Sequence, residues 1–280
     1  MILIVDSGST KADWILTDGK ERQLFSTIGF NPVYDTADDI VAELNTSLMP
    51  KLQPEQVREI HYYGTGCWDD KRKDRVREAL GRLFNSAKNV VEHDLLAAAR
   101  ASCGHLPGIA CIMGTGSNSC LYDGVSVVDN VTNLGYFLGD EGSGSHLGKM
   151  LVQAYFYREL PNDLVNDFHQ EYALTKTDIL DKIYNEDHPN VFLASFTKFL
   201  GYHQEHFYVK KLVSEAFGMF IDRHVRKYRD HTELPINFVG SIAYYFQSIL
   251  KITLEERGLN FGSVTRKPID PLVDYHEQAM

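Results

Sequence analysis

Two short segments rich in glycine and hydroxyl groups are the residues of this sequence whose types and spacing could do chemistry. The first is Asp6-Ser7-Gly8-Ser9-Thr10-Lys11, and the second is Gly114-Thr115-Gly116-Ser117-Asn118. Each follows a short apolar run, Ile2–Val5 in one case and Ile109–Met113 in the other. Glycine lets backbone N–H groups approach a ligand closely because it has no Cβ, and hydroxyl groups add further donors. The pair therefore predicts two loops that hold one phosphate chain.

The first loop also carries a carboxylate. Asp6 ends an apolar run that has no other charge, and a carboxylate at that point needs a partner such as Mg²⁺ or a Mg²⁺-bound water. The alternative is that Asp6 only caps the turn. Phosphate oxygens would be surrounded by backbone amides and a hydroxyl group from Gly8, Ser9, Thr10 and Lys11. This is not a Walker loop, because the G-x-x-x-x-G-K-[ST] spacing is missing and a strand pattern follows.

The second loop has two glycines around one threonine. Gly114 and Gly116 flank Thr115, and Ser117 comes next. A tight hairpin turn is the structural alternative, but such turns rarely need two glycines in this arrangement. We therefore interpret the segment as a second phosphate-binding loop.

Three further polar residues are candidates for the acceptor side of a reaction. Asp94 follows a strand pattern at a predicted helix start, where it could cap the helix, accept a proton from a substrate hydroxyl, or do both. His93 is expected to be a structural neighbour and not a catalyst. Asp140 is flanked by glycines and is the member of Gly139–Gly144 that best fits a ligand contact, since helix starts are normally acidic and serine-rich. Asn31 either shapes a turn or hydrogen-bonds a sugar hydroxyl.

The elements that must position these residues occur twice along the chain. A strand, a glycine loop, a second strand, an Asp-Gly turn and a third strand are predicted over residues 2–28 and again over residues 109–130. Other strands are predicted at 57–63, 89–92, 236–239 and 260–264. Helices are predicted at 37–49, from 69 or 70 to 84, at 95–102, through most of 141–228, from 241 to 256 and from about 270.

The length of 280 residues favours two domains. The loop Gly104–Gly108 is the predicted boundary, which gives an N-terminal domain of residues 1–108 and a C-terminal domain of residues 109–280. The terminal helix would be able to pack back on the N-terminal domain.

Composition excludes several classes of protein. A net charge of −10 without a basic stripe argues against a nucleic-acid partner. No apolar run is long enough to cross a membrane, and no secretory signal pattern opens the sequence, so we expect a cytoplasmic protein. The four cysteines lack a C-x-x-C spacing, which predicts reduced thiols and no zinc site.

Together these residues resemble the actin-like ATPase superfamily of sugar kinases, actin and heat-shock chaperones. Asp6–Lys11 is similar to its first phosphate motif, Gly114–Asn118 to its second, and Phe238–Ser241 to its adenosine motif. Within the superfamily the chain is most similar to the N-acetylglucosamine kinase group of the BadF/BadG/BcrA/BcrD ATPase family. The specific features are Gly114–Asn118 followed by Gly135 and Gly139–Ser143. The similarity is dense over residues 1–145 and thinner over 236–243.

The resemblance implies an α/β fold of two ribonuclease H-like lobes with a cleft between them for ATP and substrate. It implies transfer of a phosphoryl group from ATP, with Mg²⁺, to a hydroxyl of an amino sugar, with Asp94 as the base. The ATP contacts would be Gly8, Ser9, Thr10, Lys11, Gly114, Thr115, Gly116, Ser117, Gly240 and Ser241. The sugar contacts would be Asn31, Asn118 and Asp140. Relatives commonly form homodimers, while the oligomeric state of this chain stays open.

Two other functions stay open beside the kinase. A BadF-type activator holds an iron–sulfur cluster with closely placed cysteines, and this sequence has no such pair. A sugar-binding or ATP-binding regulator would need no base, whereas Asp6, Asp94 and both loops are present. Asp270-Pro271 replaces the glycine-alanine pair usual in the family, which leaves the shape of the nucleotide pocket open. The sugar could be N-acetylglucosamine, glucosamine or N-acetylmuramic acid, and the phosphorylated hydroxyl is not defined.

Overall fold

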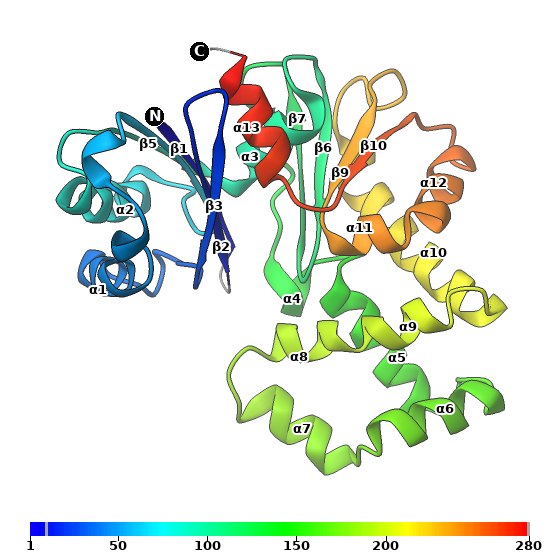
Figure 1. Cartoon of the computed structure of the whole chain (residues 1–280). Coiled ribbons are helices and arrows are strands. Elements are labelled where there is room, and N and C mark those ends of the chain that lie inside the picture. The colour runs from blue at the N-terminus through cyan, green and yellow to red at the C-terminus, as the bar shows by residue number, and fades with distance from the viewer. Residues whose placement is uncertain (9–10, 279–280) are drawn as a thin grey trace. The chain divides into compact units, whose positions relative to one another are not determined.

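The protein divides into two compact units, each built around one five-stranded sheet (Figure 1). The computed structural model describes residues 1–8 and 11–278. The first unit holds residues 1–105 and 124–126 together with the C-terminal segment that begins at Lys267. The second unit holds residues 106–123 and 127–266.

The sheet of the first unit has the order β3-β2-β1-β4-β5. Its strands are β1 (Ile2–Ser7), β2 (Ala12–Thr17), β3 (Arg22–Thr27), β4 (Glu59–Gly64) and β5 (Lys88–His93). The first three strands form an antiparallel meander, and β4 and β5 run parallel to β1. The carboxyl ends of β1, β4 and β5 therefore lie at one edge of the sheet, where the loops that follow them can meet.

Helices cover both faces of this sheet because its central strand is apolar on both sides. Successive side chains of a strand point to opposite faces. Leu3 and Val5 pack in a core with α1 (Ala37–Ser47) and α2 (Asp70–Leu83), whereas Ile4 packs with α3 (Asp94–Cys103) and α13 (Ile269–Glu277). The near-continuous apolar run of β1 is typical of a strand that is buried on both faces.

The C-terminal helix α13 belongs to the first unit. Its first turn contains Pro271, which is tolerated there because the N–H groups of a first turn have no partner within the helix. Arg22 of β3 donates to Asp274 (2.6 Å) and forms an ion pair with Glu277 (2.5 Å). Thr17 donates to Glu277 at 2.6 Å. These contacts and the apolar face of α13 hold it against β2 and β3.

The sheet of the second unit repeats the topology of the first. Its order is β10-β9-β6-β7-β8. The strands are β6 (Gly108–Met113), β7 (Ser117–Tyr122), β8 (Val127–Asp129), β9 (Ile236–Val239) and β10 (Phe261–Thr265). An antiparallel meander of β6, β7 and β8 is followed by β9 and β10, which run parallel to β6. The duplication predicted from the sequence is confirmed, and so is the α/β fold of two related lobes.

Most of the second unit beyond its sheet is helical, as the sequence predicts. The helices are α4 (Gly135–Leu138), α5 (Gly144–Phe156), α6 (Asn162–Tyr172), α7 (Lys176–Tyr184), α8 (Pro189–Ser195), α9 (Thr197–Tyr202), α10 (Phe207–Arg223), α11 (Ser241–Tyr245) and α12 (Gln247–Glu255). Helices α5, α10 and α12 share one apolar core with β6 and β9. Helix α5 also lies close against α8, where a Cβ on Gly148 would be 1.8 Å from the carbonyl oxygen of Leu193.

The cysteines agree with the expectation of reduced thiols. All four cysteines are free thiols, and Cys67, Cys111 and Cys120 are buried. Across residues 1–8 and 11–278, no helix combines the length and the apolar character that a membrane span requires.

Candidate functional site

In the first unit, the sheet register brings two loops and a helix start to one edge. Ser7 pairs with Gly64, and Gly64 pairs with His93. The loops that begin at Gly8 and Thr65 and the helix that begins at Asp94 therefore start side by side. The backbone N–H of Thr65 donates to the carbonyl oxygen of Ser7 at 2.9 Å, which ties the first two loops together.

Asp6 is partly buried at this edge, among other carboxylates. Burial raises the pKa of Asp6 to about 7, and the charges of Asp94 and Asp13 act in the same direction. A carboxylate in this setting gains from a nearby cation, because the cation offsets the repulsion. The donor set therefore fits a Mg²⁺ ion, which kinases hold through one or two carboxylates and the substrate phosphates. Within residues 1–8 and 11–278, no cluster of three or more candidate metal ligands occurs.

Asp13 is a neighbour of this site that the sequence analysis did not identify. It lies opposite Asp6 in the pairing of β1 and β2. Its carboxylate forms an ion pair with Lys11 (2.6 Å) and accepts hydrogen bonds from Ser26 (2.8 Å) and Lys267 (3.4 Å). Burial acts against these interactions, but they hold the pKa of Asp13 below its ordinary value. The signal in the sequence was a second carboxylate, on the strand that follows the loop after Asp6.

Asp94 is the first residue of α3, and His93 is its N-cap. The Nδ1 atom of His93 accepts the backbone N–H of Leu95 at 3.0 Å and lies 2.8 Å from Oδ1 of Asp94. A nitrogen that accepts this N–H carries no proton of its own, so Oδ1 of Asp94 is then a buried oxygen without a hydrogen-bond donor in the described ranges. The alternative that Asp94 caps the helix is wrong. Its role as a base stays a prediction.

His93 is also sensitive to the carboxylate beside it. Burial acts to lower the pKa of His93, but the hydrogen bond and the charge of Asp94 raise it above its ordinary value. A protonated Nδ1 would donate to Asp94 instead of accepting from the helix. The two residues therefore form a coupled pair at the end of β5.

Asn31 lies at the same edge and shapes its own loop. Its Oδ1 atom accepts the N–H of Val33 at 3.1 Å, so the expected turn is present. Within residues 1–8 and 11–278, its Nδ2 group makes no hydrogen bond, which leaves a donor for a ligand. A Cβ on Gly29 would lie 1.8 Å from the carbonyl oxygen of Gly8, and one on Gly66 would lie 2.3 Å from Oδ1 of Asn31. These glycines hold the loop of Asn31 between the loops that follow β1 and β4.

The loop after β4 is a second feature that the sequence analysis missed. It contains Thr65, Cys67 and the half-exposed Trp68, whose ring lies 4.4 Å from the guanidinium of Arg72. Burial raises the pKa of the Cys67 thiol to about 12, and the charge of Asp94 contributes to the rise. The signal was Gly64-Thr65-Gly66 at a strand end, the same composition that identified the two predicted phosphate loops.

In the second unit, the loop after β6 is held in place by the start of α5. The N–H of Gly144 donates to the carbonyl oxygen of Gly114 (2.8 Å), and the N–H of Ser145 donates to that of Thr115 (3.0 Å). The N–H of Gly114 donates to Gly116 within the loop at 3.0 Å. The loop is therefore held by backbone hydrogen bonds within itself and from the start of α5.

The carboxylate of Asp140 holds the end of this loop by a hydrogen bond. Its Oδ1 atom accepts the N–H of Ser117 (3.0 Å) and Nδ2 of Asn133 (2.7 Å). Burial raises the pKa of Asp140, and these two hydrogen bonds oppose the rise. A Cβ on Gly116 would lie 3.0 Å from Oδ2 of Asp140, which explains why a glycine follows Thr115. Asn133 is a further residue near the candidate site that the sequence analysis did not identify.

The remaining predicted residues of the second loop lie in or beside β7. Ser117 begins β7, two residues before the predicted strand start at Ser119, and its hydroxyl donates to the carbonyl oxygen of Glu141 at 2.8 Å. Asn118 follows it in the strand, and its Oδ1 accepts the N–H of Ser119 (2.9 Å) and Nδ2 of Asn130 (3.1 Å). Both residues thus have structural partners as well as predicted ligand roles.

The predicted adenosine motif lies against the same loop. Gly240 has a φ of 127°, and a Cβ there would lie 2.2 Å from the carbonyl oxygen of Met113. Glycine is therefore required for β9 to end this close to the end of β6. Ser241 begins α11 and lines a cavity of about 560 Å³. The other lining residues are Thr197, Lys198, Gly201, Tyr202, Gln204, Ile242, Tyr245 and Phe246.

The predicted residues thus form one group in each unit. Asp6, Gly8, Lys11, Asn31 and Asp94 belong to the first unit. The second unit contains Gly114, Thr115, Gly116, Ser117, Asn118, Asp140, Gly240 and Ser241. The predictions for Ser9 and Thr10 lie outside the described residues.

Comparison with solved structures gives a match over the whole chain. A protein from Porphyromonas gingivalis, named as a candidate N-acetylglucosamine kinase, has a TM-score of 0.94 and 39% sequence identity, covering 99% of each chain. A candidate N-acetylglucosamine kinase from Chromobacterium violaceum has a TM-score of 0.72 and 16% identity, covering 98% of each chain. A ROK family glucokinase from Streptomyces griseus, in complex with glucose and AMPPNP, has a TM-score of 0.55 and 12% identity, covering 97% of this chain and 98% of that chain. No protein-family model and no curated protein matched the sequence.

These comparisons differ in what they show. The second and third matches are similar in fold alone. The first match combines the same fold with 39% sequence identity over 99% of the chain. This chain therefore belongs to the N-acetylglucosamine kinase-like family of sugar kinases, which has the actin-like ATPase fold.

Proposed function

We propose that this protein is an ATP-dependent kinase that phosphorylates a hydroxyl of an amino sugar, with N-acetylglucosamine or a close relative as the acceptor. The observation that carries the proposal is the setting of Asp94. Its Oδ1 atom is buried and lacks a donor in the described ranges while His93 is neutral. An unsatisfied carboxylate oxygen at a strand end is suited to accept a proton from a substrate hydroxyl.

The proposed reaction is a single phosphoryl transfer. The sugar hydroxyl oxygen forms a bond to the γ-phosphorus of ATP, and the bond from that phosphorus to the oxygen bridging to the β-phosphorus breaks. Asp94 takes the proton of the hydroxyl, and ADP leaves with the bridging oxygen. Such a transfer needs positioning and charge stabilisation more than covalent chemistry from the protein.

The two groups of residues would divide this work. In the first lobe, Asn31 would orient the sugar through its free amide N–H₂ group. Asp6 would hold the Mg²⁺ ion, which supplies positive charge to the phosphates when it is bound. In the second lobe, the amide groups of Gly114–Ser117 would bind phosphate oxygens, because the loop is already fixed by α5.

The cavity beside Ser241 would take the nucleoside. Its volume of about 560 Å³ lies within the range of small-molecule sites. Tyr202 and Tyr245 line it with exposed rings that could pack on a base. The glucokinase of the same fold that was solved with AMPPNP supports ATP as the phosphoryl donor.

A coupled assay of ADP release over a panel of sugars tests the proposal. The panel should contain N-acetylglucosamine, glucosamine, N-acetylmuramic acid, N-acetylmannosamine and glucose, each with ATP and Mg²⁺. We expect one or more amino sugars to raise ADP release well above the sugar-free rate. Equal release with every sugar and without sugar would reject the kinase and leave a binding protein or another ATPase.

A further inference from the structure

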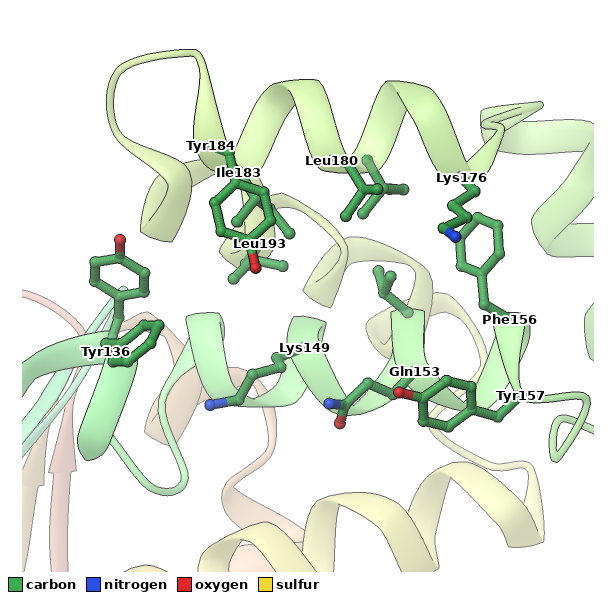
Figure 2. Close-up of a pocket in the computed structure, with 13 residues that line it drawn as sticks. Tyr136, Lys149, Gln153, Phe156, Tyr157, Lys176, Leu180, Ile183, Tyr184 and Leu193 are labelled. Atoms are coloured by element: carbon green, nitrogen blue, oxygen red, sulfur yellow. The ribbon is translucent and has the colours of Figure 1, made fainter.

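A separate cavity lies in the second lobe between α5 and α7 (Figure 2). Its volume is about 580 Å³, which is ample for a small organic molecule. Apolar side chains form its walls, namely Val152, Phe156, Ile179, Leu180, Ile183 and Leu193. None of the residues predicted to contact ATP or sugar lines it.

The packing of α7 leaves this apolar surface uncovered. Of the residues of α7, Ile179 alone is buried. The rings of Phe137 and Tyr184 at the cavity are 76% and 74% exposed. Apolar surface of this kind, gathered in a concave site, marks a place where an apolar group can bind.

The charges at the cavity select the type of ligand. Of the described residues that line it, two are lysines and none is acidic, although the protein carries a net charge of −10. Lys149 and Lys176 form no ion pair with any residue of the described ranges. Figure 2 shows the amine of Lys149 toward Tyr136 and that of Lys176 beside Phe156, at opposite ends of the cavity.

Within the described residues, the carboxylates of α7 form no ion pair with these lysines, and two of them accept hydrogen bonds from neutral groups close by. Asp178 accepts the N–H and the hydroxyl of Thr175 at 2.8 and 2.6 Å. Asp181 accepts Nδ2 of Asn185 at 3.0 Å. An apolar cavity with an unpaired ammonium group at each end is complementary to a molecule that joins a hydrocarbon chain to an anionic group.

We propose that the α5–α7 cavity binds a medium-chain carboxylate. The hydrocarbon chain would lie on the apolar walls, and the carboxylate would pair with Lys149 or Lys176. The cavity is linked to the proposed active site by α5, which lines the cavity and contacts the phosphate loop. The first residues of that helix, Gly144 and Ser145, donate hydrogen bonds to the loop of Gly114 and Thr115. A ligand against the middle of α5 is therefore placed to influence the phosphate loop.

Fluorescence titration with 11-(dansylamino)undecanoate tests the site directly and does not depend on kinase activity. The variants are Lys149→Met, Lys176→Met and the double variant. Lys182→Met is the matched control, because Lys182 is also on α7 but pairs with Glu186 and does not line the cavity. Leu180→Glu places a negative charge on the apolar wall at a residue that is already 41% exposed, so the fold should be retained.

We expect saturable binding of the probe at one site per chain. The double lysine variant and the uncharged methyl ester of the probe should each bind about tenfold more weakly or worse. Leu180→Glu should weaken binding similarly, and Lys182→Met should bind like the wild type. Unlabelled dodecanoate should displace the probe, and dodecyltrimethylammonium should not.

Three results would overturn the proposal. The first is the absence of saturable binding to the wild type. The second is equal affinity for the acid and its ester, or for the wild type and the double variant. The third is a wild-type dimer in sedimentation analysis that Leu180→Glu dissociates, since the surface would then be covered by a second copy of the chain.

Discussion

Acid should destabilise the first lobe through His276, a histidine of α13 that is only 8% exposed. Its Nε2 atom lies 2.8 Å from the hydroxyl of Tyr63, and Arg100 donates to that same hydroxyl at 2.6 Å. The Tyr63 oxygen therefore accepts from Arg100 and gives its hydrogen to Nε2, so His276 is neutral. The ring of His61 packs against it at a tilt of 31°, with centroids 3.9 Å apart. The pKa of His276 is lowered to about 3, mainly by burial, and the charges of His61 and Arg100 act in the same direction.

The sign of the effect follows from proton binding. Unfolded histidine takes up a proton near pH 6.5, whereas folded His276 does not until about pH 3. Below pH 6.5 the unfolded state binds more protons, so the free energy of unfolding decreases as the pH falls. The decrease is about 1.4 kcal/mol per pH unit, or about 2 kcal/mol between pH 6.5 and pH 5. Burial also lowers the pKa of His61, whose neighbours Glu59, Lys88 and Arg100 act on it in opposite directions.

The substitution His276→Gln removes the titrating group and keeps an acceptor for Tyr63. Urea unfolding at pH 7, 6 and 5 should be followed by tryptophan fluorescence, because both tryptophans, the fully buried Trp14 and Trp68, belong to this lobe. Between pH 7 and pH 5, the free energy of unfolding should fall by about 2 kcal/mol more in the wild type than in the variant. The exposed His105 in the same lobe provides the control, and His105→Gln should keep the wild-type slope. Parallel pH profiles for the wild type and His276→Gln would refute the reasoning.

Three glycine and amide substitutions test the geometry of the second lobe. Gly240→Ala would place Cβ 2.2 Å from the Met113 carbonyl oxygen at a φ of 127°. We therefore expect the free energy of unfolding to fall by about 3 kcal/mol or more in thermal unfolding. An unchanged melting temperature would contradict this expectation. Gly148→Ala should lower the free energy of unfolding by about 2 kcal/mol, because Leu193 blocks the methyl group, although alanine normally favours a helix by about 1 kcal/mol. Stabilisation by this substitution would show that α5 and α8 are not in close contact. Asn133→Ala removes a hydrogen-bond donor to Asp140. It should lower the free energy of unfolding in urea by about 1 kcal/mol and weaken nucleotide binding in calorimetry. Wild-type values for both measurements would show that Asn133 does not position Asp140.

The fold could be predicted from the sequence because its signals are local. The apolar runs before Asp6 and Gly114 and the two Asp-Gly turns define a meander, and the repetition of that meander defines two related sheets. The start of α1 also has a local signal, since Thr36 stands at the N-cap and forms a capping box with Asp39. These features depend on residues within a few positions of each other.

The contacts that position the site residues could not be predicted, because they depend on side-chain rotamers or join residues that only the folded chain brings together. His93 caps α3 in place of Asp94, which depends on the rotamer of its ring. Asp140 is seven residues from Asn133 and 23 residues from Ser117, and only the folded loop brings their donors to one oxygen. Asp13 and Lys267 are 254 residues apart, and they meet because the C-terminal segment returns to the first lobe.

The role of Asp94 in phosphoryl transfer is the central claim, and Asp94→Asn tests it most directly. Asparagine keeps the size of the side chain but cannot accept the proton of the sugar hydroxyl as a carboxylate does. With the sugar that is most active in the ADP-release panel, we expect calorimetry to show binding of sugar and ATP within a few fold of the wild type. The turnover number should fall by about 10²–10⁴-fold. A variant that turns over at the wild-type rate would contradict the account.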